Sequence, residues 1–247
     1  MKLSLRLFIS IVICCHIISC EELFKPEAII NDGLENITFE CYNVTSDYYF
    51  KGIFGKDSIC ANDGVNGYAI YFGIGNGFVT LTPTITIESL QSQKSKSFVD
   101  FGIQRISDSG DFLEEIRVTA QPSKFGTPLD SMVRAFIVSG VHPVRSLINK
   151  DSISTKGFEI ILSKRYWNPN LNPDTWMIIC TSALGFQPPE SNVTILDVSL
   201  IENGDYIEGY IHLHFNCRMY LQNAGKLTGT FARDMSGDFN LPIRYKL

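Results

Sequence analysis

The C-terminal third of the chain constrains the fold most, because its residues alternate between apolar and polar over a long stretch. Residues 193–201 and 206–221 both alternate, and a short polar segment, ENGD at 202–205, separates them. Alternation with a period of two is typical of a strand that buries one face. Asn-Gly suits a two-residue type I′ turn, in which both central residues need positive φ. The pattern therefore predicts a β-hairpin centred on Asn203 and Gly204.

A turn at these two residues also predicts which residues face each other across the hairpin. The expected pairs, all on the buried face, are Leu200 with Ile207, Val198 with Gly209, and Leu196 with Ile211. A slip by one residue would turn this apolar face to water. Along the second strand the same alternation directs inward Ile207, Ile211, Leu213, Phe215, Cys217 and Met219. It directs to solvent Tyr206, Glu208, Tyr210, His212, His214 and Arg218.

Further short segments rich in β-branched and aromatic residues are separated by turn residues. The predicted strands are 37–42, 49–54, 68–74, 78–81, 84–90, 98–103, 113–119, 158–164, 176–181, 227–231 and 239–245. The segment GNG at 75–77 predicts a hairpin loop. Pro242 has no N–H to donate, so it predicts that the last strand lies at an edge or that its proline faces an unpaired side. Many short strands predict an all-β fold, either an antiparallel β-sandwich or a flattened barrel.

One segment has the period of a helix instead. Its apolar residues lie at helical spacing and are Leu129, Met132, Val133, Phe136 and Ile137. Thr127 is the expected N-cap, Pro128 the first helical residue and Gly140 the stop. The sequence therefore predicts one short amphipathic helix at about residues 128–139, covering one opening of the sheet structure.

The N-terminus has the layout of a secretory signal peptide. Lys2 and Arg6 precede an apolar run of about a dozen residues, shorter than the ~20 that span a membrane. Residues 17–20 (IISC) resemble a bacterial lipobox, in which Cys20 becomes the lipidated first residue. We expect a signal peptide at 1–19, an anchor cysteine, tether and first short strand at 20–46, and a single β-sandwich domain at 47–247.

Charge and cysteine content fit an exported chain. Removal of residues 1–19 changes the formal net charge from −5 to −7, which argues against nucleic acid as a partner. The expected partner is a membrane, reached through the lipid anchor, and no cofactor is expected.

The four remaining cysteines are disulfide candidates, and the local solution pairs Cys41 with Cys60 and Cys180 with Cys217. Four free thiols and the other two pairings remain open.

A secreted eukaryotic glycoprotein is the alternative for the same N-terminus. Its glycan acceptors would be Asn36, Asn43 and Asn192, each two residues before a threonine. Such sequons also arise by chance, so the lipoprotein is the preferred interpretation.

The chain resembles the β-rich lipoproteins of Bacteroidota. The resemblance rests on the 17–20 lipobox, on the segment 50–68 (FKGIFGKDSICANDGVNGY), and on IENGDYIEGYIHLHF followed by KLTGTF near the C-terminus. It covers the two ends of the mature chain and implies no activity or site. It does imply a cell-envelope location, at the outer membrane.

No strong catalytic signature is present in the sequence, and no catalytic residue is assigned. His212 and His214 could contribute to a metal site on one strand face together with Asp197, which the predicted register places opposite Tyr210 and diagonal to His212. Solvent-facing side chains explain them better. Tyr166, Trp167 and Trp176 flank an Asn/Pro-rich loop and are candidates for a glycan-binding platform, with packing of the loop onto the sheet as the preferred explanation.

We therefore expect an exported, lipid-anchored, non-enzymatic binding or structural module of the cell envelope. A glycan or an envelope protein is its expected further partner. The alternatives are a secreted glycan-active hydrolase or carbohydrate-binding protein, and the eukaryotic glycoprotein. A hydrolase would need two carboxyl groups within ~10 Å in a cleft.

Overall fold

The computed structural model describes residues 46–77, 96–120, 123–124, 126–146, 157–165, 177–223 and 226–247. The chain divides into two compact units, Met1–Phe39 and Glu40–Leu247, and every described residue belongs to the second. The predicted strands at 37–42, 78–81 and 84–90 lie outside the described residues.

The described part of the chain is an all-β fold with one short α-helix, as the sequence predicts. Its strands are β1 Tyr49–Phe54, β2 Asp57–Asn62, β3 Tyr68–Gly77, β4 Lys96–Ile106, β5 Phe112–Thr119, β6 Ser123–Lys124, β7 Gly140–Pro143, β8 Glu159–Arg165, β9 Met177–Thr181, β10 Asn192–Asn203, β11 Tyr206–Asn223 and β12 Lys226–Lys246. The helix is α4, Leu129–Phe136, and a 3₁₀ turn, η1, spans Ser182–Leu184. Every pairing between these strands is antiparallel, with one isolated parallel bridge between Val144 and Phe158.

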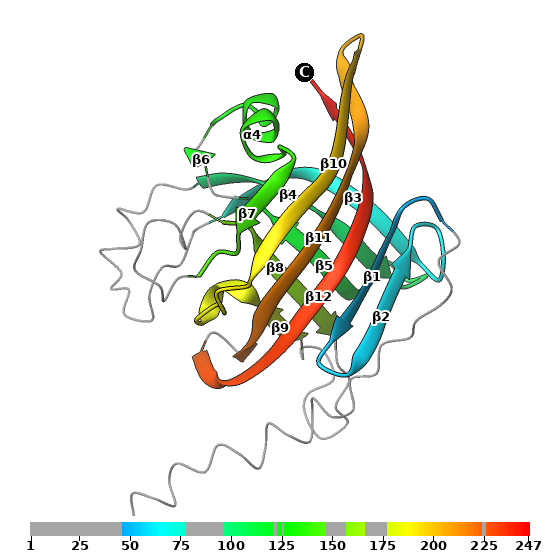
Figure 1. Ribbon diagram of the computed structural model, residues 1–247. Helices are drawn as coiled ribbons and strands as arrows, with labels where there is room; N and C mark the ends of the chain where they lie inside the picture. The colour runs from blue at the N-terminus through cyan, green and yellow to red at the C-terminus, as the bar shows by residue number, and fades with distance from the viewer. Residues whose placement is uncertain are drawn as a thin grey trace, which may run out of the picture. The chain divides into compact units, whose positions relative to one another are not determined.

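The strands form two facing layers, which are the two sheets of a sandwich. Hydrogen-bonded neighbours run in the order β2-β1-β12-β11-β9-β8-β5-β4-β3, and β10 and β7 continue from the other part of β11. Figure 1 shows β10, β11, β12, β1 and β2 in front, and β4, β5 and β8 crossing behind them in another direction. The pairing of β11 with β9 carries the path from the front layer to the back layer. Among the described strands β2 and β3 end this path without pairing with each other, so the sandwich stays open.

The interior between the layers is apolar and rich in phenylalanine. Phe50 packs on Phe239 with ring centroids 4.7 Å apart and on Phe215 at 6.0 Å, and all three side chains are 0% exposed. Phe72 stacks on Phe101 of the back layer and on Tyr245 of the front layer, so it joins the two. Truncating one such ring typically costs ~3–5 kcal/mol, which is a large part of a domain's stability.

The β10–β11 hairpin exists as predicted, but its register is displaced by two residues. Asn203 faces Tyr206, Leu200 faces Gly209 and Val198 faces Ile211. The central residues of the turn are therefore Gly204 and Asp205, and Gly204 has φ +62 whereas Asp205 has no positive φ. A glycine at the first central position is typical of a type II′ turn. A shift of two residues keeps each side chain on its predicted face, so the inward and outward sets along β11 are confirmed.

Leu196 departs from the predicted pattern because β10 contains a β-bulge. The register changes between Ile195, which faces Leu213, and Asp197, which faces His212, so Leu196 is the extra residue. Its side chain is 51% exposed instead of packing in the core. A bulge places two residues opposite one and re-aims the strand beyond it.

Two other turn predictions are wrong because glycine does not always end a strand. The segment 75–77 continues β3, which pairs along its whole length with β4. Residues 227–231 and 239–245 belong to a single strand, β12, which pairs with β11 from Lys226 to Lys246. Pro242 lies beyond Asn240, the last residue of β12 that pairs with β1, so the prediction of an unpaired side for this proline is confirmed.

The predicted helix is present but shorter than 128–139. Helix α4 begins after Pro128, which is the N-cap and makes no side-chain cap hydrogen bond, so Thr127 is not the cap. Met132 and Val133 are buried, and the helix stops at Ile137 because the chain enters β7 at Gly140. Within the described residues, no helix combines the length and the apolar character needed to span a membrane.

Gly209→Ala should destabilise the protein, because a Cβ at this position of β11 would collide with the backbone of β10. An added Cβ would overlap the carbonyl oxygen of Ser199 and crowd the Cα of Leu200. Overpacking of this kind typically costs ~1–3 kcal/mol. Urea unfolding measures the loss, and Gly73→Ala on β3 is the matched control, since no heavy atom of the described residues lies within 4 Å of its added Cβ. Equal stability of the two variants would contradict this account of the β10–β11 packing.

Candidate functional site

The aromatic platform predicted from the sequence cannot be placed. Tyr166, Trp167 and Trp176 all lie outside the described residues, as does Cys20. The platform at this loop therefore stays a prediction.

The two histidines lie on the outer face of the front layer, as predicted, but they do not share a site with Asp197. His214 Nδ1 lies 3.0 Å from the Asp238 carboxylate of β12. Asp197 lies directly opposite His212 and instead accepts a hydrogen bond of 2.5 Å from the Tyr210 hydroxyl. The predicted diagonal placement of Asp197 and His212 is wrong, because the register differs by two residues. Asp197 thus bonds Tyr210, and Asp238 bonds His214.

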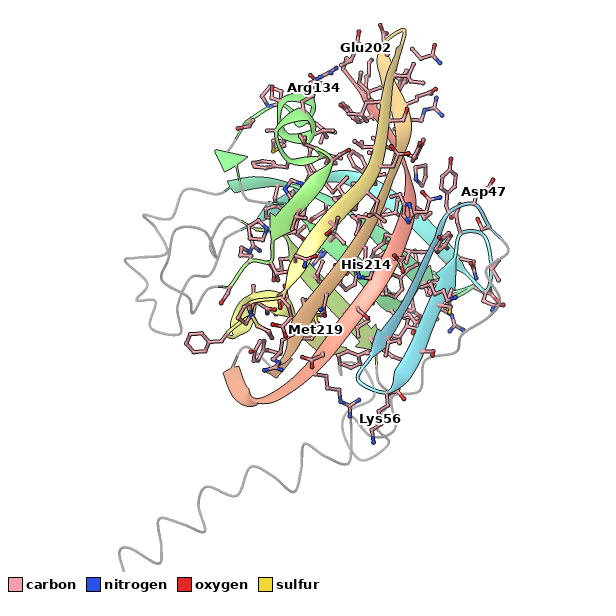
Figure 2. All side chains as sticks on the ribbon, in the orientation of Figure 1. Asp47, Lys56, Arg134, Glu202, His214 and Met219 are labelled. Atoms are coloured by element: carbon pink, nitrogen blue, oxygen red, sulfur yellow. The ribbon has the colours of Figure 1, made fainter. Side chains whose placement is uncertain are left out.

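No group of three or more His, Cys, Asp or Glu side chains in the described part of the chain is arranged to hold a metal ion. A catalytic zinc site needs three protein ligands that converge on one point. His214–Asp238 and Tyr210–Asp197 are instead separate pairs on one face (His214 is labelled in Figure 2).

The predicted pairing of Cys180 with Cys217 is wrong. Cys217 is a free thiol, 1% exposed, and its Sγ lies 3.5 Å from the Met219 sulfur in the core. Cys180 is the cross-strand partner of Leu221, four residues further along β11. At ~3.3 Å per residue this places the two cysteines ~13 Å apart, beyond the ~7 Å limit between the Cα atoms of a disulfide. Burial raises the pKa of the Cys217 thiol, so the inert, protonated form is favoured.

Cys60 has a different state, because it is disulfide-bonded. It lies on β2 and is 2% exposed. The structure does not identify its partner, so the pairing with Cys41 remains a prediction.

The described part of the chain has a hollow of about 740 Å³ on the outer face of β10, β11 and β12. Its floor consists of two cross-strand rows, one of Ser199, Tyr210 and Pro242 and the other of Ile201, Glu208 and Arg244. Strands lie ~4.8 Å apart and alternate residues ~6.8 Å apart, so the floor measures roughly 10 by 7 Å. We call this feature the Tyr210 hollow.

Hydrogen bonds and ion pairs hold the side chains of the Tyr210 hollow in place. Arg244 Nε lies 3.2 Å from Glu208 Oε1, and its guanidinium lies over the Tyr206 ring at 5.1 Å from the centroid. The amide of Asn203 donates to the other carboxylate oxygen of Glu208 at 3.2 Å. The bond to Asp197 fixes the edge of the Tyr210 ring and raises the pKa of its hydroxyl. The floor is therefore organised without a ligand.

The rim of the Tyr210 hollow comes from two separate elements. Tyr48, just before β1, lines one side, and the amide of Asn240 holds the preceding residue by donating to the Asp47 carbonyl at 2.6 Å. Glu202, at the hairpin tip, lines the other end. Its side chain lies on the inner face of the sheet, opposite Ile207, and forms an ion pair of 3.0 Å with Arg134 of α4. Figure 2 shows Arg134 reaching from the helix toward Glu202 at the hairpin tip.

A second group of charged side chains is buried on the face of the back layer that points away from the core. Arg145 is 6% exposed and forms an ion pair with Glu159, which also accepts a 2.5 Å hydrogen bond from Thr181. Asp100, 8% exposed, accepts a 2.7 Å hydrogen bond from Thr119. These contacts tie the chain after β7 to β8 and β9, and β4 to β5. Removing one partner of a buried pair typically costs ~3–5 kcal/mol, so this cluster is a structural element of the fold.

Burial dominates the protonation of this cluster. It raises the pKa of Asp100, and the Thr119 hydrogen bond and nearby Arg117 offset only part of this effect. It also lowers the pKa of Arg145 to about 10, against the attraction of Asp100. Two nitrogens of Arg145, Nε and Nη1, are buried without a hydrogen-bond partner among the described residues. The contacts of each charged group therefore offset only part of the free-energy cost of burying its charge.

The Tyr210 hollow does not follow from the sequence alone, although the alternation along β11 correctly directs Tyr210 and Glu208 outward. The missing information was the cross-strand register, because only the true register brings Pro242 and Arg244 beside them. Asp100 could have been noticed as a carboxylate between Val99 and Phe101 in a predicted strand. Its burial depends on contacts outside its own strand.

Asp100→Asn should stabilise the protein at neutral and alkaline pH. The pKa of Asp100 is raised in the folded state, so its contribution to stability is fully present below the unfolded pKa and is lost as the pH rises through the folded pKa. The amide retains an acceptor for Thr119 and has no charge to desolvate. Urea unfolding should show a gain near pH 8 and none near pH 3. Asp108→Asn, on an exposed turn, is the control and should show no such difference; an equal gain for Asp100→Asn at both pH values would contradict the explanation.

Comparison of the chain with known proteins gives no match, so a function can be inferred only from the sequence and from the geometry of the fold. No family model matches the chain, and neither a curated protein nor a solved structure matches it. The Tyr210 hollow is accordingly the candidate site on structural grounds.

Proposed function

We propose that the protein is an exported, non-enzymatic binding module, anchored to the cell envelope through Cys20 and binding its ligand in the Tyr210 hollow. The hollow itself carries this proposal. It is open, it lies on a regular sheet face, and its aromatic and polar side chains are fixed by contacts with one another. Preorganised polar groups beside apolar surface are typical of binding sites.

The state of the carboxylates favours binding over hydrolysis. A glycosidase uses two carboxyl groups that face the substrate, one of them as an acid. In the Tyr210 hollow, Glu208 is bonded to Arg244 and Asn203, and Glu202 to Arg134. The carboxylate of Asp197 is bonded to the Tyr210 hydroxyl. Each carboxylate is thus engaged in a structural contact.

Export is supported by the N-terminal sequence and by the disulfide-bonded Cys60. Residues 1–19 have the layout of a signal peptide, and Cys20 ends the lipobox-like segment. Structural disulfides persist in oxidising compartments outside the cytosol. An outer-membrane location follows from the resemblance to Bacteroidota lipoproteins.

Saturable binding of the full chain to isolated envelopes tests the binding role. The chain should carry Cys20→Ser, so that a lipid anchor does not contribute to the signal. Tyr210→Ala should weaken this binding, whereas His214→Ala, on the same face but outside the hollow, should not. Binding that is absent, or that is the same in both variants, would exclude the Tyr210 hollow as the functional site.

Cys20→Ser should also release the protein from membranes while leaving its fold intact. Each buried methylene of an acyl chain contributes ~0.8 kcal/mol, so the loss of several chains removes the anchor. Fractionation of cells measures retention, and the intact mass of the native protein separates an acylated Cys20 from a free Glu21 N-terminus and from added hexoses. Unchanged membrane retention of the variant would exclude the lipoprotein.

A peptide map without reduction should recover Cys60 joined to Cys41. The two are the nearest pair among the four disulfide candidates Cys41, Cys60, Cys180 and Cys217, and export provides the oxidising environment. Cys217 should react with a thiol reagent only after denaturation, because it is buried. A peptide that joins Cys60 to a different cysteine would contradict the local pairing.

A further inference from the structure

The chemistry of the Tyr210 hollow narrows the class of ligand, and this inference rests on the proposed function. Its side chains are of two kinds that alternate across the floor. Tyr210, Pro242 and Ile201 present ring or hydrocarbon surface, and Tyr210 and Ile201 are 37% and 63% exposed. Glu208 and Arg244 beside them present a planar carboxylate and a planar guanidinium. A ligand that fits must offer an apolar face and several hydroxyl groups close together.

The charges of the hollow are already balanced by pairs. Glu208 on the floor is neutralised by Arg244, and Glu202 at the tip by Arg134. An anionic ligand would meet the carboxylate of Glu208, and a cationic one would have to compete with Arg244. A neutral ligand can instead accept hydrogen bonds from the N–H groups of Arg244 that no described residue occupies, because this side chain is 69% exposed, without breaking the pair.

The floor of the hollow is a sheet face and not a strand edge. It lies over three strands that pair with each other, and Tyr210 faces Ser199 on one side and Pro242 on the other. A peptide that adds to a sheet would instead use the unpaired backbone groups of a strand edge. A ligand that lies on the floor is therefore held by side chains.

We propose that the Tyr210 hollow binds a neutral oligosaccharide. One sugar ring stacks its C–H face on the Tyr210 ring, and its neighbouring hydroxyls bond the Glu208–Arg244 pair. Tyr48, at the rim near Pro242, flanks the bound oligosaccharide. The floor of roughly 10 by 7 Å accommodates one to two sugar rings, which suits a module that grips a short segment of a longer glycan.

The prearranged contacts explain how a shallow hollow can still bind. Tyr210 is held through its hydroxyl by Asp197, and Glu208 is held by both Arg244 and Asn203. Side chains that are ordered before binding lose less entropy when the ligand arrives. Polyvalent glycans add avidity to such weak single sites.

Affinity electrophoresis in gels that contain a neutral polysaccharide tests the proposal directly. The probes are soluble β-glucan, dextran, mannan and galactomannan, with polygalacturonate as the anionic comparison. The full chain carrying Cys20→Ser should be retarded by at least one neutral polysaccharide and not by polygalacturonate. No retardation by any neutral probe, or stronger retardation by the anionic one, would overturn the proposal.

Variants of the hollow make the test specific. Tyr210→Ala should weaken binding at least tenfold, because it removes the stacking surface. Tyr210→Phe keeps the ring and loses only the Asp197 hydrogen bond, so it should stay within about threefold of the parent, the size expected for one exposed hydrogen bond. His214→Ala should bind as the parent does, and thermal unfolding should confirm that each variant is folded. Equal binding by Tyr210→Ala and the parent would overturn the assignment.

Periodate treatment separates the ligand class from the binding role. Periodate cleaves the vicinal diols of sugars, so treatment of the isolated envelopes with periodate should abolish their binding of the full chain. Envelope binding that depends on Tyr210 but survives periodate would overturn the oligosaccharide and leave the binding module standing. An absence of envelope binding would overturn both.

Discussion

Strand β11 is the element on which the rest of the structure depends, because its backbone pairs with three different strands. It pairs with β12 along nearly its whole length, with β10 over one part and with β9 at its end. Its alternate side chains, from Ile207 to Met219, are buried at 0–1% exposure. The inner face of this strand thus packs in the core, its end connects the front layer to the back layer, and its outer face carries the centre of the Tyr210 hollow. A change of register in β11 would alter all three together.

The all-β class, the hairpin and the helix could be predicted because they depend on local periodicity. The faces of His212 and Tyr210 followed from the alternation of β11 alone. The register did not follow, because the Asn203-Gly204 dipeptide favours one turn while the chain uses Gly204 and Asp205. Both dipeptides suit a two-residue hairpin turn, so the turn residues alone do not select the register. The bulge at Leu196 changes the register again, between Ile195 and Asp197.

The candidate site was less predictable, because it is made by residues that are distant in the sequence. Tyr48 and Pro242 share one hollow although they belong to the two ends of the domain. The histidines attract attention in the sequence because metal ligands are rare and conspicuous, yet in the fold His214 bonds Asp238 and Asp197 bonds Tyr210. The buried Arg145–Glu159 pair was equally hidden, since each residue lies in an ordinary polar position of its own segment.

Glu202 lines the tip end of the Tyr210 hollow and also forms the ion pair with α4, so the charged side chains and the strands beneath them respond differently to dissolved salt. The strands are held by backbone pairing, which salt hardly affects. The Glu202–Arg134 and Glu208–Arg244 pairs are exposed, worth ~0–1 kcal/mol each, and are screened over ~8 Å at physiological ionic strength. The helix has a second attachment, from the Tyr245 hydroxyl to Asp130 at 3.0 Å, which keeps it near the sheet when its ion pair opens. Rising ionic strength can therefore loosen the charged side chains around the hollow while the backbone of its three strands keeps its shape.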